Sequence, residues 1–118
     1  MPNDAGDDFT SRVLDVVAAI PDGKVMSYSD VAAAIGSRAA RAVGQVMAYS
    51  GVDVRWWRVV RASGHAAVGH EERALQHYRA EGTPLRWSGE NFRVDVAAAR
   101  YVPRDSRPQA VRDVWLIG

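Results

Sequence analysis

Two short helical stretches separated by a glycine–serine pair place the strongest constraint on how this chain can fold. In the first, SYSDVAAAIG, Ser27 and Asp30 have the spacing of a capping box, and Gly36 supplies the stop. In the second, SRAARAVGQVMAYSG, Ser37 is a candidate cap, apolar residues recur at helical spacing, and Gly51 follows the end. Two helices joined by so tight a turn predict a helix-turn-helix.

The charge of the chain is unevenly distributed, although its formal net charge is only +1. Residues 1–30 contain six aspartates against one arginine and one lysine, whereas residues 31–61 contain five arginines against one aspartate. The five arginines are Arg38, Arg41, Arg55, Arg58 and Arg61. Such a basic stretch can face phosphate groups, but a solvated face explains it equally well. The first two of these arginines fall in the second helix of the predicted motif.

Composition bounds the class of protein. A chain of 118 residues with 47% hydrophobic and 25% charged residues is expected to form one globular domain. It has no cysteine, which excludes disulfides, thiolate metal sites and cysteine nucleophiles. The start, MPNDAGDD, is acidic, and no long apolar run follows, so we expect neither a signal peptide nor a membrane span. These features predict a cytoplasmic protein, associated with the nucleoid if it is bacterial, that does not contact a membrane.

Further elements are predicted on both sides of the motif. Apolar residues at helical spacing predict helices over residues 8–20 and 71–82. Between them, RWWRVV is typical of a strand, and Ser63 and Gly64 predict a turn that leads to a return strand through residues 67–68. This hairpin would form a wing beside the helix-turn-helix.

The last part of the chain is poorly periodic, although FRVDV alternates like a strand. We therefore predict a domain over residues 1–82 and a C-terminal extension over residues 83–118 that packs on the same domain.

Three segments resemble, in their order, the DNA-binding domain of the O6-alkylguanine-DNA alkyltransferases. They are FTSRVLDVVAAIPDGKVMSYSDVAAAIG, RAVGQVM and RWWRVVRASG, and the resemblance extends over roughly residues 9–82. The resemblance implies a mainly α fold with a small β wing, a winged helix-turn-helix-like domain of the alkyltransferase C-terminal type. It also implies that the recognition helix enters the minor groove, where little sequence is read.

The active-site motif of that family is altered in this chain. Active members have Pro-Cys-His-Arg-Val where this chain has Arg55-Trp56-Trp57-Arg58-Val59, so the acceptor cysteine aligns with Trp56 and the histidine with Trp57. Tryptophan commonly replaces that cysteine in the alkyltransferase-like proteins, the non-catalytic branch, although Arg55 and Trp57 depart from its usual Pro-Trp-His-Arg as well. This branch implies tight binding of alkylated guanine in duplex DNA without repair, followed by hand-over to nucleotide excision repair.

The chemistry of the altered motif supports a loss of catalysis. Alkyl transfer needs an ionisable nucleophile activated by a neighbouring base, normally a thiolate beside a histidine. The indole nitrogen of Trp56 can only donate its hydrogen, because its lone pair belongs to the aromatic system. We therefore expect no enzyme activity and no catalytic residue.

The resemblance assigns DNA contacts to individual residues. Arg41 matches the arginine finger that fills the stack vacated by a flipped nucleotide, and a plain surface arginine is the alternative. Tyr28 matches the tyrosine that presses on the phosphate beside that nucleotide, and half-buried packing is the alternative. Ala42 and Gly44 are small, as a helix lying close in a groove requires, though helix packing explains them equally well. The expected DNA-binding residues are Tyr28, Arg38, Arg41, Ala42, Gly44 and Arg55.

The lesion pocket is expected around Trp56, which would contact the damaged base by stacking. Trp57 should face the core or the other flank, because successive residues of a strand point to opposite sides. Arg58 either supports this loop through hydrogen bonds or contacts a phosphate, and His70 could reach the base edge. The expected pocket residues are Tyr28, Trp56, Arg58, Ser63, Gly64 and His70.

No cofactor or metal is expected. His65, His70 and His77 lack the cysteine or closely spaced carboxylate that would complete a ligand set.

Three classes of function follow from these observations. The first is a monomeric, non-catalytic protein that binds alkylated guanine in double-stranded DNA and signals to nucleotide excision repair proteins. The second is a winged-helix transcription regulator, which would select a sequence motif and usually dimerise. The third is a residual enzyme, whose mass would increase on incubation with alkylated DNA.

Overall fold

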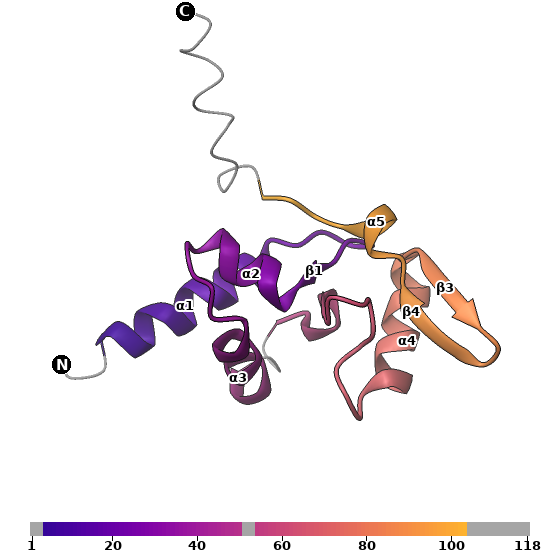
Figure 1. Cartoon of the computed structure of the whole chain (residues 1–118), viewed down its shortest axis with the longest axis horizontal. Helices are drawn as coiled ribbons and strands as arrows, with labels where there is room; N and C mark the ends of the chain where they lie inside the picture. Colours follow the sequence, from indigo (N-terminus) through magenta and orange to yellow (C-terminus); the bar gives the residue numbers. More distant parts are fainter. Residues whose placement is uncertain (1–3, 51–53, 104–118) are drawn as a thin grey trace, which may run out of the picture.

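The computed structural model describes residues 4–50 and 54–103 (Figure 1). Helices α1, α2 and α3 lie at one side of the molecule, and α4 with the strands β3 and β4 lies at the other (Figure 1). Among the described residues, no helix is long and apolar enough to cross a membrane.

Helix α1 (Asp4–Ala18) confirms the first predicted helix, with both ends shifted toward the N-terminus. Its inward stripe includes Val13 and Val17, which are fully buried. The helix ends in tighter turns, in which the amides of Ala19 and Ile20 donate to carbonyls three residues earlier. Pro21 follows directly, and proline cannot continue the backbone ladder.

Helix α2 (Tyr28–Ala34) begins at the predicted capping box. The Ser27 hydroxyl accepts from the Asp30 amide at 3.0 Å, and the Asp30 carboxylate accepts from the Ser27 amide at 3.2 Å. Two amides at the start of the helix are thereby satisfied, which holds Tyr28 at its first turn.

Helix α3 (Ala40–Ser50) completes the helix-turn-helix. It starts later than the sequence predicts, because the Ser37 hydroxyl accepts from the amide of Ala39 within the turn. Arg41 lies on the helix, whereas Arg38 lies in the turn before it, which corrects the prediction that both are helical. The predicted end at Gly51 falls outside the described residues.

The segment expected to form the wing folds differently. Trp56–Arg58 is a short 3-10 helix, η2, and it is followed by strand β2 (Val59–Val60), which pairs in parallel with β1 (Met26–Ser27). The predicted return strand over residues 67–68 is absent from the described structure of this segment. Both residues of β2 are buried, because the strand lies between two layers and has no solvent side to alternate with.

The wing is instead a hairpin farther along the chain. Helix α4 (Glu71–Glu81) is followed by the antiparallel strands β3 (Leu85–Ser88) and β4 (Asn91–Val94), and then by the short helix α5 (Val96–Ala99). The alternation seen in FRVDV therefore does mark a strand, but its partner is the segment before it.

Two clusters of buried side chains hold these elements together. One joins α1, α2 and α3 through residues that include Val13, Val31 and Val43. The other joins β2, α4 and the C-terminal elements, and includes Tyr78 and Val94. The extension packs on the part of the chain that precedes it at least as far as Tyr101, which contacts the first cluster and donates its amide hydrogen to the Val25 carbonyl.

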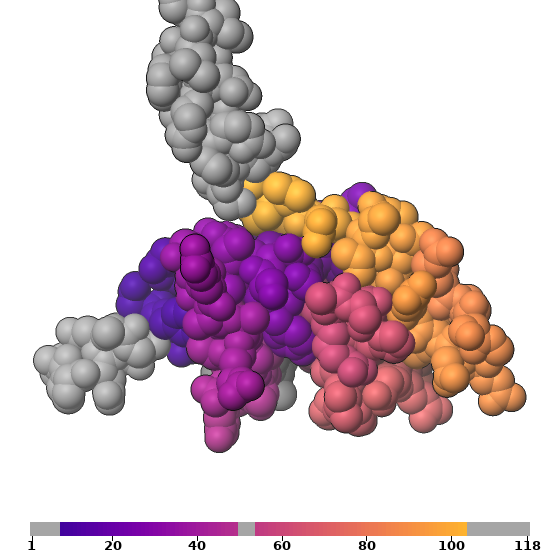
Figure 2. Space-filling view, in the orientation of Figure 1, coloured from indigo at the N-terminus to yellow at the C-terminus, as the bar shows by residue number. Residues whose placement is uncertain are grey.

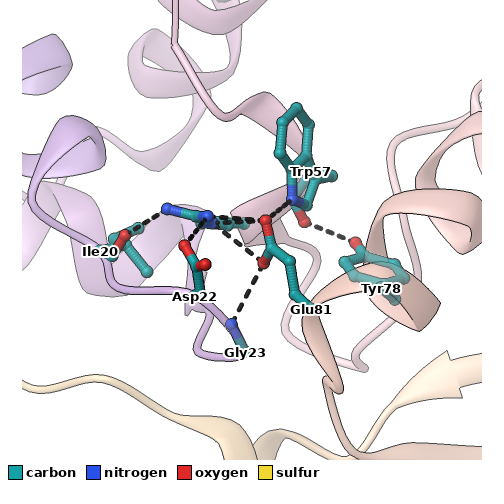
Figure 3. A network of polar contacts seen from close by, with 7 residues as sticks. Ile20, Asp22, Gly23, Trp57, Tyr78 and Glu81 are labelled. Atoms are coloured by element: carbon teal, nitrogen blue, oxygen red, sulfur yellow. Dashed lines mark hydrogen bonds and ion pairs between the residues drawn. The ribbon is translucent and has the colours of Figure 1, made fainter.

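A buried ion cluster joins the two halves (Figure 3). The Arg58 guanidinium donates to the Ile20 carbonyl at 2.6 Å and to the Glu81 carboxylate at 2.6 Å, and it also pairs with Asp22. Glu81 accepts in turn from the amide of Gly23 at 3.1 Å. The side chains of Arg58 and Glu81 are only 7% and 11% exposed, so water screens this pair little.

The electrostatic state of Glu81 follows from this arrangement. Burial raises the pKa of Glu81, but hydrogen bonds from Arg58, the Gly23 amide and Trp57 outweigh it, and the pKa lies below the usual 4.5. A carboxylate with a lowered pKa stabilises the folded state above its unfolded pKa, and the contribution is lost as the pH falls through the folded pKa.

We expect Arg58→Met to lower the free energy of unfolding by about 3–5 kcal/mol at neutral pH, because Glu81 would stay buried without its counter-charge. The deficit relative to wild type should shrink below about pH 4.5, since protonated Glu81 no longer attracts Arg58. Urea denaturation of both proteins at neutral and acid pH measures the difference. Asp22→Asn, at the exposed end of the cluster, should cost much less. A deficit that stays constant with pH would contradict the pairing.

Gly64 should tolerate no side chain. Its φ is +94°, and a Cβ there would lie 2.3 Å from the Val94 carbonyl oxygen. We expect Gly64→Ala to cost about 2–4 kcal/mol, because strand β4 must move away. Gly69→Ala is the matched control, with φ of +86° but nothing within 4 Å, and should cost about 1–2 kcal/mol. Thermal melting of the two variants compares them, and equal losses would argue against the close contact.

Candidate nucleic-acid interface

A cavity of about 370 Å³ opens between the helix-turn-helix and the segment that leads into α4. Figure 2 shows a notch between these two parts of the surface. The lining residues are Tyr28, Gly44, Met47, Ala48, Trp56, Ala67, Val68, His70 and Arg73. Four of them, Tyr28, Gly44, Trp56 and His70, belong to the residues that the sequence singled out.

The helical side of the cavity is set by backbone geometry. Tyr28 is placed by the capping box at the start of α2, and burial raises its pKa, which the nearby charge of Arg61 only partly offsets. Gly44 faces open space, since a Cβ there would meet nothing within 4 Å. Met47 and Ala48 follow on the same face of α3, at three and four residues from Gly44.

Trp56 is held among aromatic and cationic side chains. Its ring lies 5.6 Å from that of His70 and edge-on to those of Trp57 and His77, at 5.7 and 5.9 Å between centroids. The Arg73 guanidinium lies 5.7 Å from the centroid of the Trp56 ring. Cation–π and edge-to-face contacts of this kind fix the ring plane, so the cavity has a preformed aromatic wall.

Trp57 takes a different direction and does not line the cavity. Its indole nitrogen donates to Glu81 at 2.8 Å, and its carbonyl accepts from the Tyr78 hydroxyl at 2.6 Å (Figure 3). Its ring stacks on that of His77, with 3.5 Å between the centroids. The sequence also predicts that Trp57 points away from Trp56, but from an extended strand, whereas the backbone here makes a 3-10 turn.

Three arginines that the sequence singled out do not line the cavity, and they have no counter-charge in the described part of the chain. Arg41 is exposed on α3, Arg38 is exposed in the preceding turn, and Arg55 is exposed just before η2. None of them forms an ion pair with a described acidic residue. Ala42 is half-buried on α3, which agrees with a role in packing or in close approach.

Three other residues expected at the pocket lie elsewhere. Arg58 is buried in the ion cluster, where hydrogen bonds to Glu81 and Ile20 occupy its guanidinium. Ser63 is exposed and contacts the His65 ring at 2.6 Å, and Gly64 is buried against β4. Two roles were expected for Arg58, support of its loop through hydrogen bonds or contact with a phosphate. Its position agrees with the first role, because a phosphate could not reach a cation that is buried in this way.

Sequence reasoning missed Met47, Ala48 and Arg73. Helical spacing from Gly44 could have indicated the first two. Arg73 lies in the first turn of a helix far from the motif, and nothing local in the sequence marks it. In the described residues, no three histidine or acidic side chains are grouped so that they could hold a metal ion.

Comparison with known proteins agrees with this geometry. The family model of the 6-O-methylguanine DNA methyltransferase DNA-binding domain matches residues 8–83. The DNA base-flipping protein of Escherichia coli is 42% identical over 89 residues, which is 71% of this chain and 69% of that protein. Alkyltransferase-like protein 1 of Schizosaccharomyces pombe is 39% identical over 61 residues, covering 49% of this chain and 56% of that one.

Solved structures give the same result. S. pombe Atl1 in complex with damaged DNA containing O6-carboxymethylguanine superposes with a TM-score of 0.72 at 28% identity, over 82% of this chain and 97% of that chain. Mycobacterium tuberculosis O6-methylguanine methyltransferase superposes with a TM-score of 0.55 at 33% identity, over 63% of this chain and 48% of that chain. The mainly α, winged helix-turn-helix fold of the alkyltransferase type is thereby confirmed. The chain belongs to the family of the DNA-binding domain of 6-O-methylguanine DNA methyltransferase.

Proposed function

We propose that this protein recognises O6-alkylguanine in duplex DNA without repairing it. The damaged nucleotide rotates out of the helix into the cavity beside Trp56, and the bound complex signals to nucleotide excision repair proteins. One relative is a DNA base-flipping protein, and another, Atl1, is bound to damaged DNA in its solved structure. The proposal extends these properties to this chain.

The observation that carries the proposal is a preformed cavity walled by Trp56 in a chain without cysteine. Its volume, about 370 Å³, is within the range of small-ligand sites. Flat aromatic walls bind bases by stacking, with about 1–3 kcal/mol per base. The site is therefore suited to hold a base but has lost the family's acceptor.

Two of the polar side chains that line the cavity, those of Tyr28 and Arg73, are poor alkyl acceptors. Tyr28 carries a hydroxyl there, and burial raises its pKa, so the phenol stays protonated at neutral pH. Arg73 is a permanent cation and cannot act as a nucleophile. Neither side chain could replace the missing thiolate as the acceptor of the alkyl group.

Three exposed arginines suit a DNA backbone. Arg38, Arg41 and Arg55 have no described counter-charge, so phosphates would neutralise them without breaking an internal ion pair. Arg41 lies one helical turn before Gly44, which lines the cavity, and from there it could fill the gap left by a flipped nucleotide. Tyr28, at the cavity edge of α2, would press on the neighbouring phosphate.

The proposal includes a monomeric protein that acts in the cytoplasm or on the nucleoid. Binding without base-specific groove contacts suits the search for damage in any sequence context.

We expect the protein to bind a duplex with one O6-methylguanine at least about tenfold more tightly than the same duplex with guanine, because stacking and apolar contacts in the pocket supply over 1.4 kcal/mol. Fluorescence anisotropy at fixed salt measures both affinities. After incubation, mass spectrometry should find the protein mass unchanged and the lesion intact. Equal affinities would overturn the proposal, and selection of a sequence motif from random undamaged DNA would instead indicate a transcription regulator.

Trp56→Ala and Arg41→Ala should both reduce the preference for the lesion, the first by removing the stacking wall and the second by removing the residue that fills the gap. We expect each to lose about 1–3 kcal/mol of lesion binding and less of undamaged binding. The same anisotropy titrations provide the measurement.

Two matched variants serve as controls. Trp57→Phe keeps the stack on His77 but loses the hydrogen bond to Glu81, so it should lower stability and leave the preference unchanged. Arg38→Ala should weaken binding to both duplexes by the same factor. If Trp57→Phe abolished the preference and Trp56→Ala did not, the assignment of the two tryptophans would be reversed.

A further inference from the structure

We propose that the polar face of the β3–β4 hairpin is a second DNA contact, which binds the sugar–phosphate backbone beside the damaged nucleotide. The inference rests on the proposed function and adds a site to it. The site is a shallow depression of about 330 Å³. Its polar lining residues are His65, Arg86, Ser88, Asn91 and Arg93, and the aromatic residues Trp87 and Phe92 line it as well.

The register of the hairpin places like charges together. Arg86 on β3 lies directly opposite Arg93 on β4. Like charges at such a position destabilise a sheet, because the two side chains project from the same face. A pair of phosphate oxygens between the two guanidinium groups would turn this repulsion into attraction.

The arginines are not neutralised within the described protein. Arg93 forms no ion pair or hydrogen bond there, and Arg86 makes one loose contact of 3.7 Å with Asp95. Asp95 also accepts a hydrogen bond from the Ala98 amide at the start of α5, so it is shared. Glu90, the other nearby acid, is exposed in the hairpin turn and pairs with no described cation.

The opposite face of the hairpin is anchored to α4. Phe92 packs edge-on to the buried Tyr78 at 6.1 Å, and the Arg79 guanidinium lies 5.5 Å from the centroid of the Trp87 ring. Because side chains alternate along a strand, this anchoring turns Arg86 and Arg93 away from α4. The polar face is therefore held in place before any ligand binds.

A short loop connects this face to the lesion cavity. His65 lines the depression and His70 lines the cavity, and their Cα atoms can be at most about 17 Å apart because five residues span no more. Base pairs follow at about 3.4 Å along a strand, so the hairpin would meet the backbone within about five base pairs of the flipped nucleotide. One duplex can therefore reach both sites.

The chemistry of the face favours a nucleic acid over an acidic protein. Arg86, Ser88, Asn91 and Arg93 project from one face of the hairpin by alternation, whereas Trp87 and Phe92, which also line the depression, belong to the other face. Arginine, serine and asparagine are typical donors to phosphate oxygens. We therefore infer backbone contacts that carry no base specificity.

The test measures the salt dependence of binding to lesion and undamaged duplexes by fluorescence anisotropy. Each lost phosphate contact reduces the slope of log K against log salt by about 0.9. Between 50 and 200 mM salt, wild-type affinity should therefore fall about threefold more than that of Arg93→Gln, and about tenfold more than that of the Arg86→Gln/Arg93→Gln double variant. The ratio of lesion to undamaged affinity should not change, and the melting temperature should stay equal or rise because like charges are removed.

Arg79→Gln is the matched control, since it removes a charge from the same hairpin region on the opposite face. It should leave the salt slope unchanged. A second experiment uses two duplexes, in which the lesion lies within about two base pairs of one end or of the other. Arg93→Gln should reduce the salt slope with only one of these duplexes, because with the other the hairpin would lie beyond the end of the DNA. An effect that is equal for both ends would contradict a contact on one side.

The outcomes separate this inference from the proposed function. If wild type prefers the lesion but Arg93→Gln and the double variant keep the wild-type slope, the hairpin site is overturned and the lesion pocket stands. If wild type shows no preference but the variants lose slope on undamaged DNA, the hairpin binds DNA and the proposed function fails. Loss of binding to a poly-glutamate peptide, without any change on DNA, would assign the face to an acidic protein and overturn the inference.

Discussion

The Arg58 guanidinium is the contact on which the arrangement of this molecule depends. It lies in the centre of the chain and binds the end of α1 through the Ile20 carbonyl and the end of α4 through Glu81. Glu81 extends the link to the turn after α1, through the amide of Gly23. A buried cation with these partners allows one relative position of the two halves, because any other would leave a charge without compensation.

The same cluster orients the two adjacent tryptophans. Glu81 accepts from the indole of Trp57, and Tyr78 on the same helix donates to the Trp57 carbonyl. A 3-10 turn has about three residues per turn, so neighbouring side chains differ in direction by about 120°. Once Trp57 is bound to α4, Trp56 is left to face α2 and α3, and the cavity forms where it meets them. The stability of the protein and the shape of the candidate site thus depend on one short segment.

Features of the fold and of the site that depend on contacts between sequence neighbours could be predicted, whereas those that depend on contacts between distant residues could not. The capping box of Ser27 and Asp30 is complete within four residues, and the helix-turn-helix is formed as the sequence indicates. The wing was misplaced because strand β2 pairs with β1, more than 30 residues earlier, and alternation within RWWRVV could not show this. Tyr28, Gly44, Trp56 and His70 do meet at one cavity, but Arg58, Ser63 and Gly64, close to Trp56 in sequence, have other partners.

The sequence by itself determined the start of α2 and the chemistry that is absent. That helix begins at a capping box formed by near neighbours, and a chain without cysteine cannot offer a thiolate to an alkyl group. Only the tertiary structure decided which tryptophan lines the cavity, which arginine is buried and where the wing lies. These outcomes depend on partners 23 to 58 residues apart, such as Arg58 with Glu81 and Gly23 with Glu81. Burial and ion pairing act on groups brought together by the fold, and their strength is set by how fully water is excluded there.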